Sequence, residues 1–298
     1  MVQKALSRRR YFFGNRARIL YELIGWQFRN AHDLRFMNYG FADDTQPGPD
    51  LHPEDEAERY CAQLYHALAT QADLKGKNVL DIGSGRGGGA AFVHKYMQPR
   101  RTIGCDLARN AIRFCQRTYG DVANLKFTRA NAMDLPFDDA SFDAVLNVES
   151  SHCYPDCNAF FAEVFRVLKP GGCFLYTDFT APGKAPAEYI RDITAALDRA
   201  GFVNVESSDI TQQILRGLDA DNDRRIREIH EHFPFGTRRL ACLWAGTRGS
   251  WIYRDFASGD RRYVMYHLSK PEPAALRPIA PSKLVLAVEP ARTDQVPA

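Results

Sequence analysis

The chain has 298 residues, of which 45% are hydrophobic and 25% charged, a composition typical of globular proteins. Its 39 basic and 36 acidic residues leave a net charge of only +3, which does not favour a nucleic-acid partner. Because no apolar run approaches the roughly 20 residues of a membrane span and the N-terminus lacks an apolar signal segment, we expect a cytoplasmic protein whose seven cysteines are reduced.

The first 72 residues predict a mainly helical N-terminal extension that is rich in aromatic side chains. Tyr21, within RARILYELIGWQF, is the residue expected to anchor this extension over the site and its substrate. An added N-terminal helix is also a natural element for subunit contact, so we expect a homo-oligomer. Within this extension, residues 45–53 are rich in Pro, Asp and Gly and predict a loop.

Residues 73–270 predict one core domain in which strands alternate with helices. The strands are expected at residues 78–82, 101–106, 125–129, 142–148 and 173–179. Helical spacing of apolar residues fills the intervals, as with Ile112, Cys115 and Tyr119. This alternation indicates an α/β fold, a doubly wound, Rossmann-like and mainly parallel sheet whose ligand site lies at the carboxyl ends of the strands.

The rest of the core adds a helix at residues 185–200 and two last strands at 203–208 and 263–268. Between those strands, residues 210–258 are helical and charged, which predicts either a lid over the ligand edge or a solvated helical cap. The last 28 residues, 271–298, hold six prolines and read as a Pro-rich tail.

The most informative segment is VLDIGSGRGGG at residues 79–89. Glycines directly after a strand allow a tight turn and close approach of the backbone to a ligand. Their spacing also fits a dinucleotide site, so an NAD-dependent oxidoreductase stays open. Asp81, two residues before Gly83, is well placed for a cationic ligand, and Asp106 ends the next strand, where an acid can accept from ribose hydroxyls.

DIGSGRGG resembles motif I of the class I S-adenosylmethionine (SAM)-dependent methyltransferases, and GCD, RANAMDLPF, FDAVLNV and EVFRVLKPGGCFLYTDF fit the later segments in order. The resemblance implies SAM as cofactor, with S-adenosylhomocysteine (SAH) as product. It assigns Asp81, Gly83 and Gly85 to the amino-acid part of SAM and Asp106 to its ribose. Further cofactor residues are expected at Leu107, Asn131, Ala132 and Asn147, with Asn131 and Ala132 at the adenine. The family more often has Asp where Asn131 stands, but an amide oxygen still accepts a hydrogen bond.

The loop NVESSHCYPD at residues 147–156 is expected at the same edge, facing the sulfonium. It resembles the equivalent segment of the mycobacterial phthiotriolone dimycocerosate methyltransferases. A looser likeness exists to sterol and tocopherol C-methyltransferases and to terpenoid-indole C-methyltransferases of the teleocidin kind. His152 is the expected base, since imidazole titrates near neutral pH. Glu149 is expected to bind the SAM ammonium, orient His152 or stabilise a carbocation, and Tyr154 to line the pocket.

These features predict a methyltransferase that acts on a lipophilic small molecule of specialised metabolism. We expect methylation at carbon of a prenyl or terpenoid alkene, with a cation that can cyclise, while O-methylation of a lipid or polyketide hydroxyl is the alternative. A non-catalytic SAM-fold scaffold also stays open. No histidine or cysteine spacing supports a metal, so none is expected.

Overall fold

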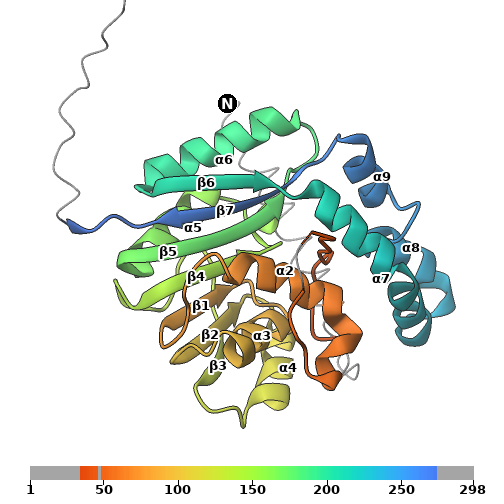
Figure 1. The fold of residues 1–298 in the computed structure, drawn as a ribbon, viewed down its shortest axis with the longest axis horizontal. Helices are drawn as coiled ribbons and strands as arrows, with labels where there is room; N and C mark the ends of the chain where they lie inside the picture. Colours follow the sequence, from red (N-terminus) through yellow and green to blue (C-terminus); the bar gives the residue numbers. More distant parts are fainter. Residues whose placement is uncertain (1–33, 46–47, 274–298) are drawn as a thin grey trace, which may run out of the picture.

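One mixed sheet of seven strands forms the centre of the computed structural model, which describes residues 34–45 and 48–273 (Figure 1). The strands are β1 (Asn78–Ile82), β2 (Arg101–Asp106), β3 (Leu125–Arg129), β4 (Phe142–Val148), β5 (Leu168–Phe179), β6 (Val203–Asp209) and β7 (Tyr263–Ser269). Their order is β3-β2-β1-β4-β5-β7-β6, and β7 runs antiparallel to both of its neighbours. The predicted doubly wound, mainly parallel sheet is confirmed.

The strand order reverses direction beside β1, and this reversal sets the place of the site. From β1 the chain proceeds outward through β2 and β3, then returns to place β4 on the other side of β1. Loops that leave β1 and β4 therefore turn to opposite faces and leave a crevice at the carboxyl edge, where open α/β sheets bind ligands. The strands read as continuous apolar runs because both faces are covered, and all five residues of β1 are buried.

Helices cover both faces of the sheet. One face carries α2 (Arg59–Ala69), α3 (Gly88–Tyr96) and α4 (Arg109–Tyr119), which follow a 3₁₀ turn η1 (Pro53–Glu58). The other face carries α5 (Cys157–Val167) and α6 (Pro186–Ala200). Alternation along each strand divides the core accordingly: Val79 packs with α2 and α3, whereas its neighbour Leu80 packs with α5 and α6.

A helical insertion joins β6 to β7 at the carboxyl edge of the sheet, where the sequence predicted residues 210–258. It consists of α7 (Thr211–His232), the 3₁₀ turn η3 (Phe235–Thr237), α8 (Arg238–Trp244) and α9 (Trp251–Ser258). The buried residues Ile214, Leu218, Ile252 and Phe256 attach it to the same core as α2 (Figure 1). The insertion thus lies beside the edge at which β1 and β4 end.

Two predictions about secondary structure need correction. The fifth strand was expected to begin at Cys173, but β5 starts at Leu168 because the Lys-Pro-Gly-Gly segment bulges within the strand, with Gly171 at φ +73°. Residues 34–44 contain no helix, contrary to the mainly helical extension, whereas residues 48–52 form part of the predicted loop and residues 53–69 are helical. The predictions for residues 1–33, Tyr21 among them, and for residues 274–298 concern positions outside the described residues.

Within residues 34–45 and 48–273, none of the helices combines the length and the apolar character that crossing a bilayer requires.

Candidate active site

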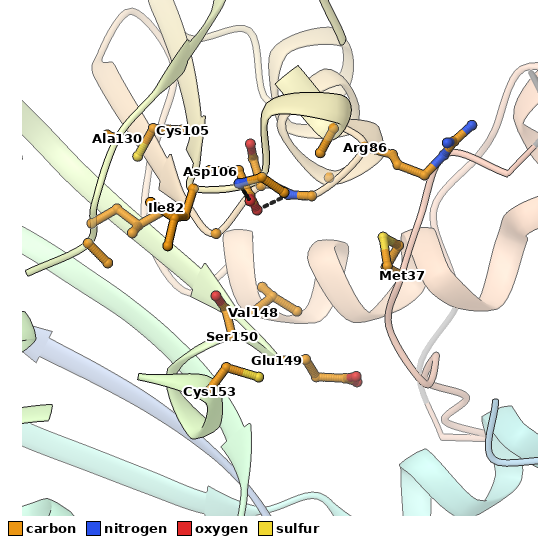
Figure 2. Close-up of a pocket in the computed structure, with 18 of the residues that line it drawn as sticks. Met37, Ile82, Arg86, Cys105, Asp106, Ala130, Val148, Glu149, Ser150 and Cys153 are labelled. Carbon is orange, nitrogen blue, oxygen red and sulfur yellow. Dashed lines mark hydrogen bonds between the residues drawn. The ribbon is translucent and has the colours of Figure 1, made fainter. Parts of the chain in front are cut away.

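A cavity of about 360 Å³ opens at the carboxyl ends of β1, β2 and β4. The cavity is lined by residues 35–38, 82–86, 105–108, 130–133, 148–150 and 153–155, together with Tyr65, Gly89 and Ala111. Figure 2 shows Asp106 on one wall, with Glu149, Ser150 and Cys153 on the opposite wall and Met37 at the side. The loops that leave three neighbouring strands therefore converge on one space, as the topology requires.

The glycines after β1 keep side chains out of this space. Gly83 and Gly85 have φ values of +72° and +53°, a conformation that L side chains rarely adopt. A Cβ atom on Gly83 would lie 1.9 Å from the Ser150 hydroxyl oxygen, and one on Gly89 would lie 1.8 Å from the Tyr65 ring. The glycine pattern therefore serves close packing as well as the turn itself.

Asp81 lies directly behind the cavity wall rather than on it, with only 1% of its surface exposed. The Tyr65 hydroxyl approaches its Oδ2 atom at 3.5 Å, while Oδ1 has no hydrogen-bond partner among the described residues. Burial, and next the nearby charge of Asp106, raise the pKa of Asp81 to about 8. A buried carboxylate that lacks a partner is costly, so a cationic group in the cavity fits this position.

Asp106 lines the cavity at the end of β2. Its two carboxylate oxygens accept from the backbone N–H groups of Gly85, at 2.9 Å, and Ala108, at 2.8 Å, so it ties the glycine loop to the turn before α4 (Figure 2). A carboxylate oxygen can accept more than one hydrogen bond, so Asp106 can meet a ligand while it holds these two loops. A ribose with two hydroxyls fits a carboxylate held in this way.

The remaining cofactor predictions divide into two groups. Leu107, Asn131 and Ala132 line the cavity, and the Asn131 side chain accepts from the Met133 N–H at 3.2 Å. Asn147 does not line it: its fully buried amide donates to the Ile82 carbonyl at 2.8 Å and to the Tyr154 hydroxyl at 3.2 Å. Asn147 therefore ties the end of β1 to the loop after β4, while its buried Oδ1 atom has no hydrogen-bond partner among the described residues.

Glu149 and Tyr154 both line the cavity from the loop after β4. Glu149 adopts φ +47°, and its Oε1 accepts from the Tyr39 N–H at 2.7 Å and from the Tyr263 hydroxyl at 2.8 Å. No described residue donates to Oε2. Burial raises the pKa of Glu149 to about 7, so this carboxyl group exchanges a proton near neutral pH.

His152 is not among the cavity-lining residues, contrary to its predicted place as the base. Its Nδ1 lies 2.9 Å from the Oδ1 atom of the buried Asp178, its backbone N–H donates to Oδ2, and its ring stacks on Phe179 at 4.3 Å. Burial opposes protonation, but the Asp178 carboxylate outweighs it and holds the pKa of His152 well above the usual value. The pair is therefore ionic at neutral pH and fixes the loop that carries Glu149.

Residues 34–42, here called the strap, belong to the N-terminal extension that was expected over the site, and residues 35–38 of the strap line the cavity. The buried Glu58 accepts from the N–H groups of Arg35, at 2.9 Å, and Phe36, at 3.0 Å, and from the Arg35 guanidinium. The Gly88 N–H donates to the Arg35 carbonyl, which joins the strap to α3. Glu58 precedes Cys61, the first buried residue of α2, by three residues, and this position was a signal for an anchor. Nothing in the sequence indicated that Arg35 and Phe36 would be its partners.

Comparisons with known proteins agree with this geometry. Residues 80–176 match the methyltransferase domain family. The chain is 38% identical to a fatty-acid O-methyltransferase of Mycolicibacterium smegmatis, over 80% of this chain and 84% of that protein. It is 36% identical to a phthiotriol/phenolphthiotriol dimycocerosates methyltransferase of Mycobacterium tuberculosis, over 80% and 86% respectively.

Solved structures show the same fold. SpnF, described as a 4+2 cyclase, superposes with a TM-score of 0.65 at 19% identity, covering 85% of this chain and 94% of its own. Geranyl diphosphate C-methyltransferase from Streptomyces coelicolor, solved with SAH, superposes with a TM-score of 0.58 at 19% identity, covering 84% and 98%. At these identities the likeness concerns the fold alone.

SAM-binding and dinucleotide-binding α/β enzymes share a Rossmann-like sheet with a glycine turn and an acid at its carboxyl edge. The matches above decide between these two classes. The chain belongs to the SAM-dependent methyltransferases. The oxidoreductase and the non-catalytic scaffold that the sequence left open are set aside by these matches. The residues around the cavity fit SAM, since the buried Oδ1 of Asp81 lacks a partner among the described residues and Asp106 lines the same cavity.

Proposed function

We propose that the protein transfers the methyl group of SAM to a hydroxyl oxygen of a lipophilic small molecule. Relatives at 36–38% identity are named for methyl transfer to fatty acids and to phthiotriol dimycocerosates, which supports a lipid acceptor, and the fatty-acid enzyme is named an O-methyltransferase. The choice of a hydroxyl over a carboxyl oxygen rests on the charges around the cavity. The carbon acceptor that the sequence favoured has its support in solved structures at 19% identity, which bear on the fold only. Apolar side chains on the wall, such as Met37, Met133 and Val148, suit a lipophilic ligand.

The charges around the cavity favour a cationic donor and a neutral acceptor. Asp81, Asp106 and Glu149 are carboxyl groups at or directly behind the wall. The two lining arginines are engaged elsewhere, because Arg35 pairs with Glu58 at 2.9 Å and the Arg86 guanidinium stacks 3.6 Å from the centre of the Phe114 ring. An anionic acceptor such as a carboxylate would meet repulsion here, whereas an alcohol would not.

Glu149 is the group that we assign to the proton. As the acceptor oxygen bonds to the methyl carbon, the carbon–sulfur bond breaks and its electron pair stays on sulfur, which gives SAH. The hydroxyl proton passes to Oε2 of Glu149, the oxygen to which no described residue donates. Because the pKa of Glu149 is raised to about 7 by burial, its carboxylate is a stronger base than an exposed one.

His152 and Asp178 are positioning residues in this account. Their ion pair fixes the turn at Ser151–Cys153, and Asp178 also accepts from the Ser151 hydroxyl at 2.6 Å. This turn follows Glu149 directly, so the pair holds the proton acceptor against the cavity. The helical insertion of residues 211–258 lies beside the same edge, and none of its residues lines the cavity.

The experiment uses SAM labelled with carbon-13 at the methyl group and a panel of lipophilic alcohols, carboxylic acids and prenyl alkenes. We expect label in a methoxy group of an alcohol product, detected by NMR. Label on an alkene-derived carbon would restore the carbon acceptor, and label in a methyl ester would refute the charge argument.

Glu149→Gln tests the assigned proton acceptor with the same alcohol. We expect turnover to fall at least about a hundredfold, the usual range for a general base, while SAH affinity stays within about twofold. In the unaltered enzyme, turnover should fall as the pH drops below about 7, because Glu149 then holds a proton. Turnover that is independent of pH between 5.5 and 8, or unchanged in Glu149→Gln, contradicts the assignment.

A further inference from the structure

The segment between α7 and α9 combines basic residues with apolar residues that are not buried. Residues 233–250, FPFGTRRLACLWAGTRGS, contain three arginines and no acidic residue. The segment includes α8, whose sequence RRLACLW is largely apolar, yet none of its seven residues is buried against the described part of the chain. One side of α8 packs on α7 and α9, where the Trp244 ring lies 5.8 Å from the Trp251 ring. Its outer side is apolar and exposed, so another surface can cover it.

Large apolar side chains project from this segment. Phe235, Leu240 and Trp244 are 88%, 58% and 50% exposed, which makes them the three most exposed large hydrophobic side chains among the described residues. Figure 1 shows α8 at the outer side of the insertion, beyond α7 and away from the sheet. We call these three side chains, together with Arg238 and Arg239, the α8 patch.

The arginines of the patch carry charge that no described carboxylate neutralises. Arg238 donates to the carbonyls of Phe233, at 3.0 Å, and His230, at 2.7 Å, and its guanidinium lies 5.9 Å from the centre of the Phe235 ring. Neither Arg238 nor Arg239 forms an ion pair within the described residues. Arg248, at the end of the same segment, differs because it pairs with Asp219 at 2.8 Å.

We propose that the α8 patch docks on an anionic lipid membrane surface. Exposed aromatic and aliphatic side chains beside arginines suit the boundary between headgroups and acyl chains, where apolar burial and attraction to anionic lipid act together. Charge argues against three other surfaces that could cover the patch, namely residues 1–33, residues 274–298 and a second copy of this chain. Residues 1–33 contain seven basic and two acidic residues, residues 274–298 three and two, and a second copy would oppose arginine to arginine.

The patch is connected to the acceptor wall. The Tyr39 hydroxyl lies 3.5 Å from the Trp244 carbonyl oxygen, and the backbone N–H of Tyr39 donates to Glu149. Trp244, which would contact the membrane, therefore lies beside Tyr39 of the strap, and residues 35–38 of the strap line the cavity. The docking does not depend on the proposed function, whereas delivery of a lipophilic acceptor by this route does.

The test measures cosedimentation of the full chain with vesicles of phosphatidylcholine alone and of phosphatidylcholine mixed with phosphatidylglycerol. We expect binding to the mixed vesicles, weakened by salt, and little binding to phosphatidylcholine alone. Arg238→Gln with Arg239→Gln should weaken binding about thirtyfold, since each arginine near an anionic surface contributes about fivefold. Phe235→Ser with Leu240→Ser and Trp244→Ser should weaken it at least about tenfold.

Val122→Ser is the matched control, because Val122 is 41% exposed in the loop after α4 and should leave binding unchanged. Calorimetry with SAH checks that each variant is folded, and this readout keeps the docking separate from methyl transfer. Equal binding by the α8 variants and the unaltered chain overturns the proposal, since the lipid contact then lies elsewhere. Absence of binding to anionic vesicles, or a dimer in sedimentation velocity that the apolar variant dissociates, overturns it as well.

Discussion

Asp81 makes SAM and SAH binding depend on pH in a defined direction. The carboxyl group is buried, and its pKa is raised to about 8 by burial and by Asp106, so the empty site holds a proton at neutral pH. The ammonium group of the bound ligand stabilises the ionised form of Asp81. Binding is therefore expected to release this proton, and affinity should rise with pH until Asp81 is ionised in the free protein.

The size of the effect follows from the pKa. At pH 7 a group with a pKa of about 8 is protonated in roughly nine of ten molecules, which weakens the apparent affinity ~10-fold relative to high pH. Between pH 6 and pH 8 we expect SAH affinity to rise ~50-fold and then to level off. Asp81→Asn removes the titrating group, so its affinity should stay nearly constant from pH 6 to pH 8 and should be at least ~50-fold weaker than that of the unaltered protein at pH 8.

Isothermal titration calorimetry with SAH measures both quantities. Repeating each titration in two buffers of different ionisation enthalpy gives the number of protons released, which should approach one below pH 7. The Asp81→Asn protein also corrects for ionisation of the ligand itself. An affinity that stays flat from pH 6 to pH 8 in the unaltered protein, or equal slopes in the two proteins, would refute the reasoning.

Two further variants test the packing around the site. Asp178→Asn removes the charge that stabilises the His152 imidazolium, so NMR titration of the ring should show the pKa of His152 moving down, whereas an unchanged value means that Asp178 does not control it. Gly89→Ala places a methyl group 1.8 Å from the Tyr65 ring and should lower the free energy of unfolding by about 1–3 kcal/mol, while Gly236→Ala, which meets nothing within 4 Å, is the matched control. Equal denaturation midpoints for the two alanine variants would contradict the close packing of Gly89.

Local patterns in the sequence were sufficient for most of the fold. The bounds of β1 to β4 agree with the prediction because each is a short apolar run between turn residues and helical periodicity. The insertion between β6 and β7 was also placed correctly. The start of β5 was missed because a Lys-Pro-Gly-Gly segment ordinarily marks a turn, and here it bulges inside a strand that pairs on both sides.

The prediction of the site was correct for residues that directly follow a strand. It failed for residues whose position depends on contacts with distant segments of the chain. Asp106 and Glu149 occupy the expected wall because strand ends define it. His152 was misplaced because sequence does not show that Asp178, at the end of β5, binds its ring. The strap and its anchor Glu58 depend on contacts between segments more than twenty residues apart, which periodicity does not encode.

A crystal structure with SAH and a lipophilic alcohol would test the central claim most directly. We predict that the SAH amino group lies within hydrogen-bond distance of Asp81 Oδ1, with the ribose hydroxyls on Asp106. The alcohol oxygen should lie within hydrogen-bond distance of Glu149 Oε2 and face the sulfur. An alcohol bound away from Glu149, or an amino group that turns away from Asp81, would contradict the account.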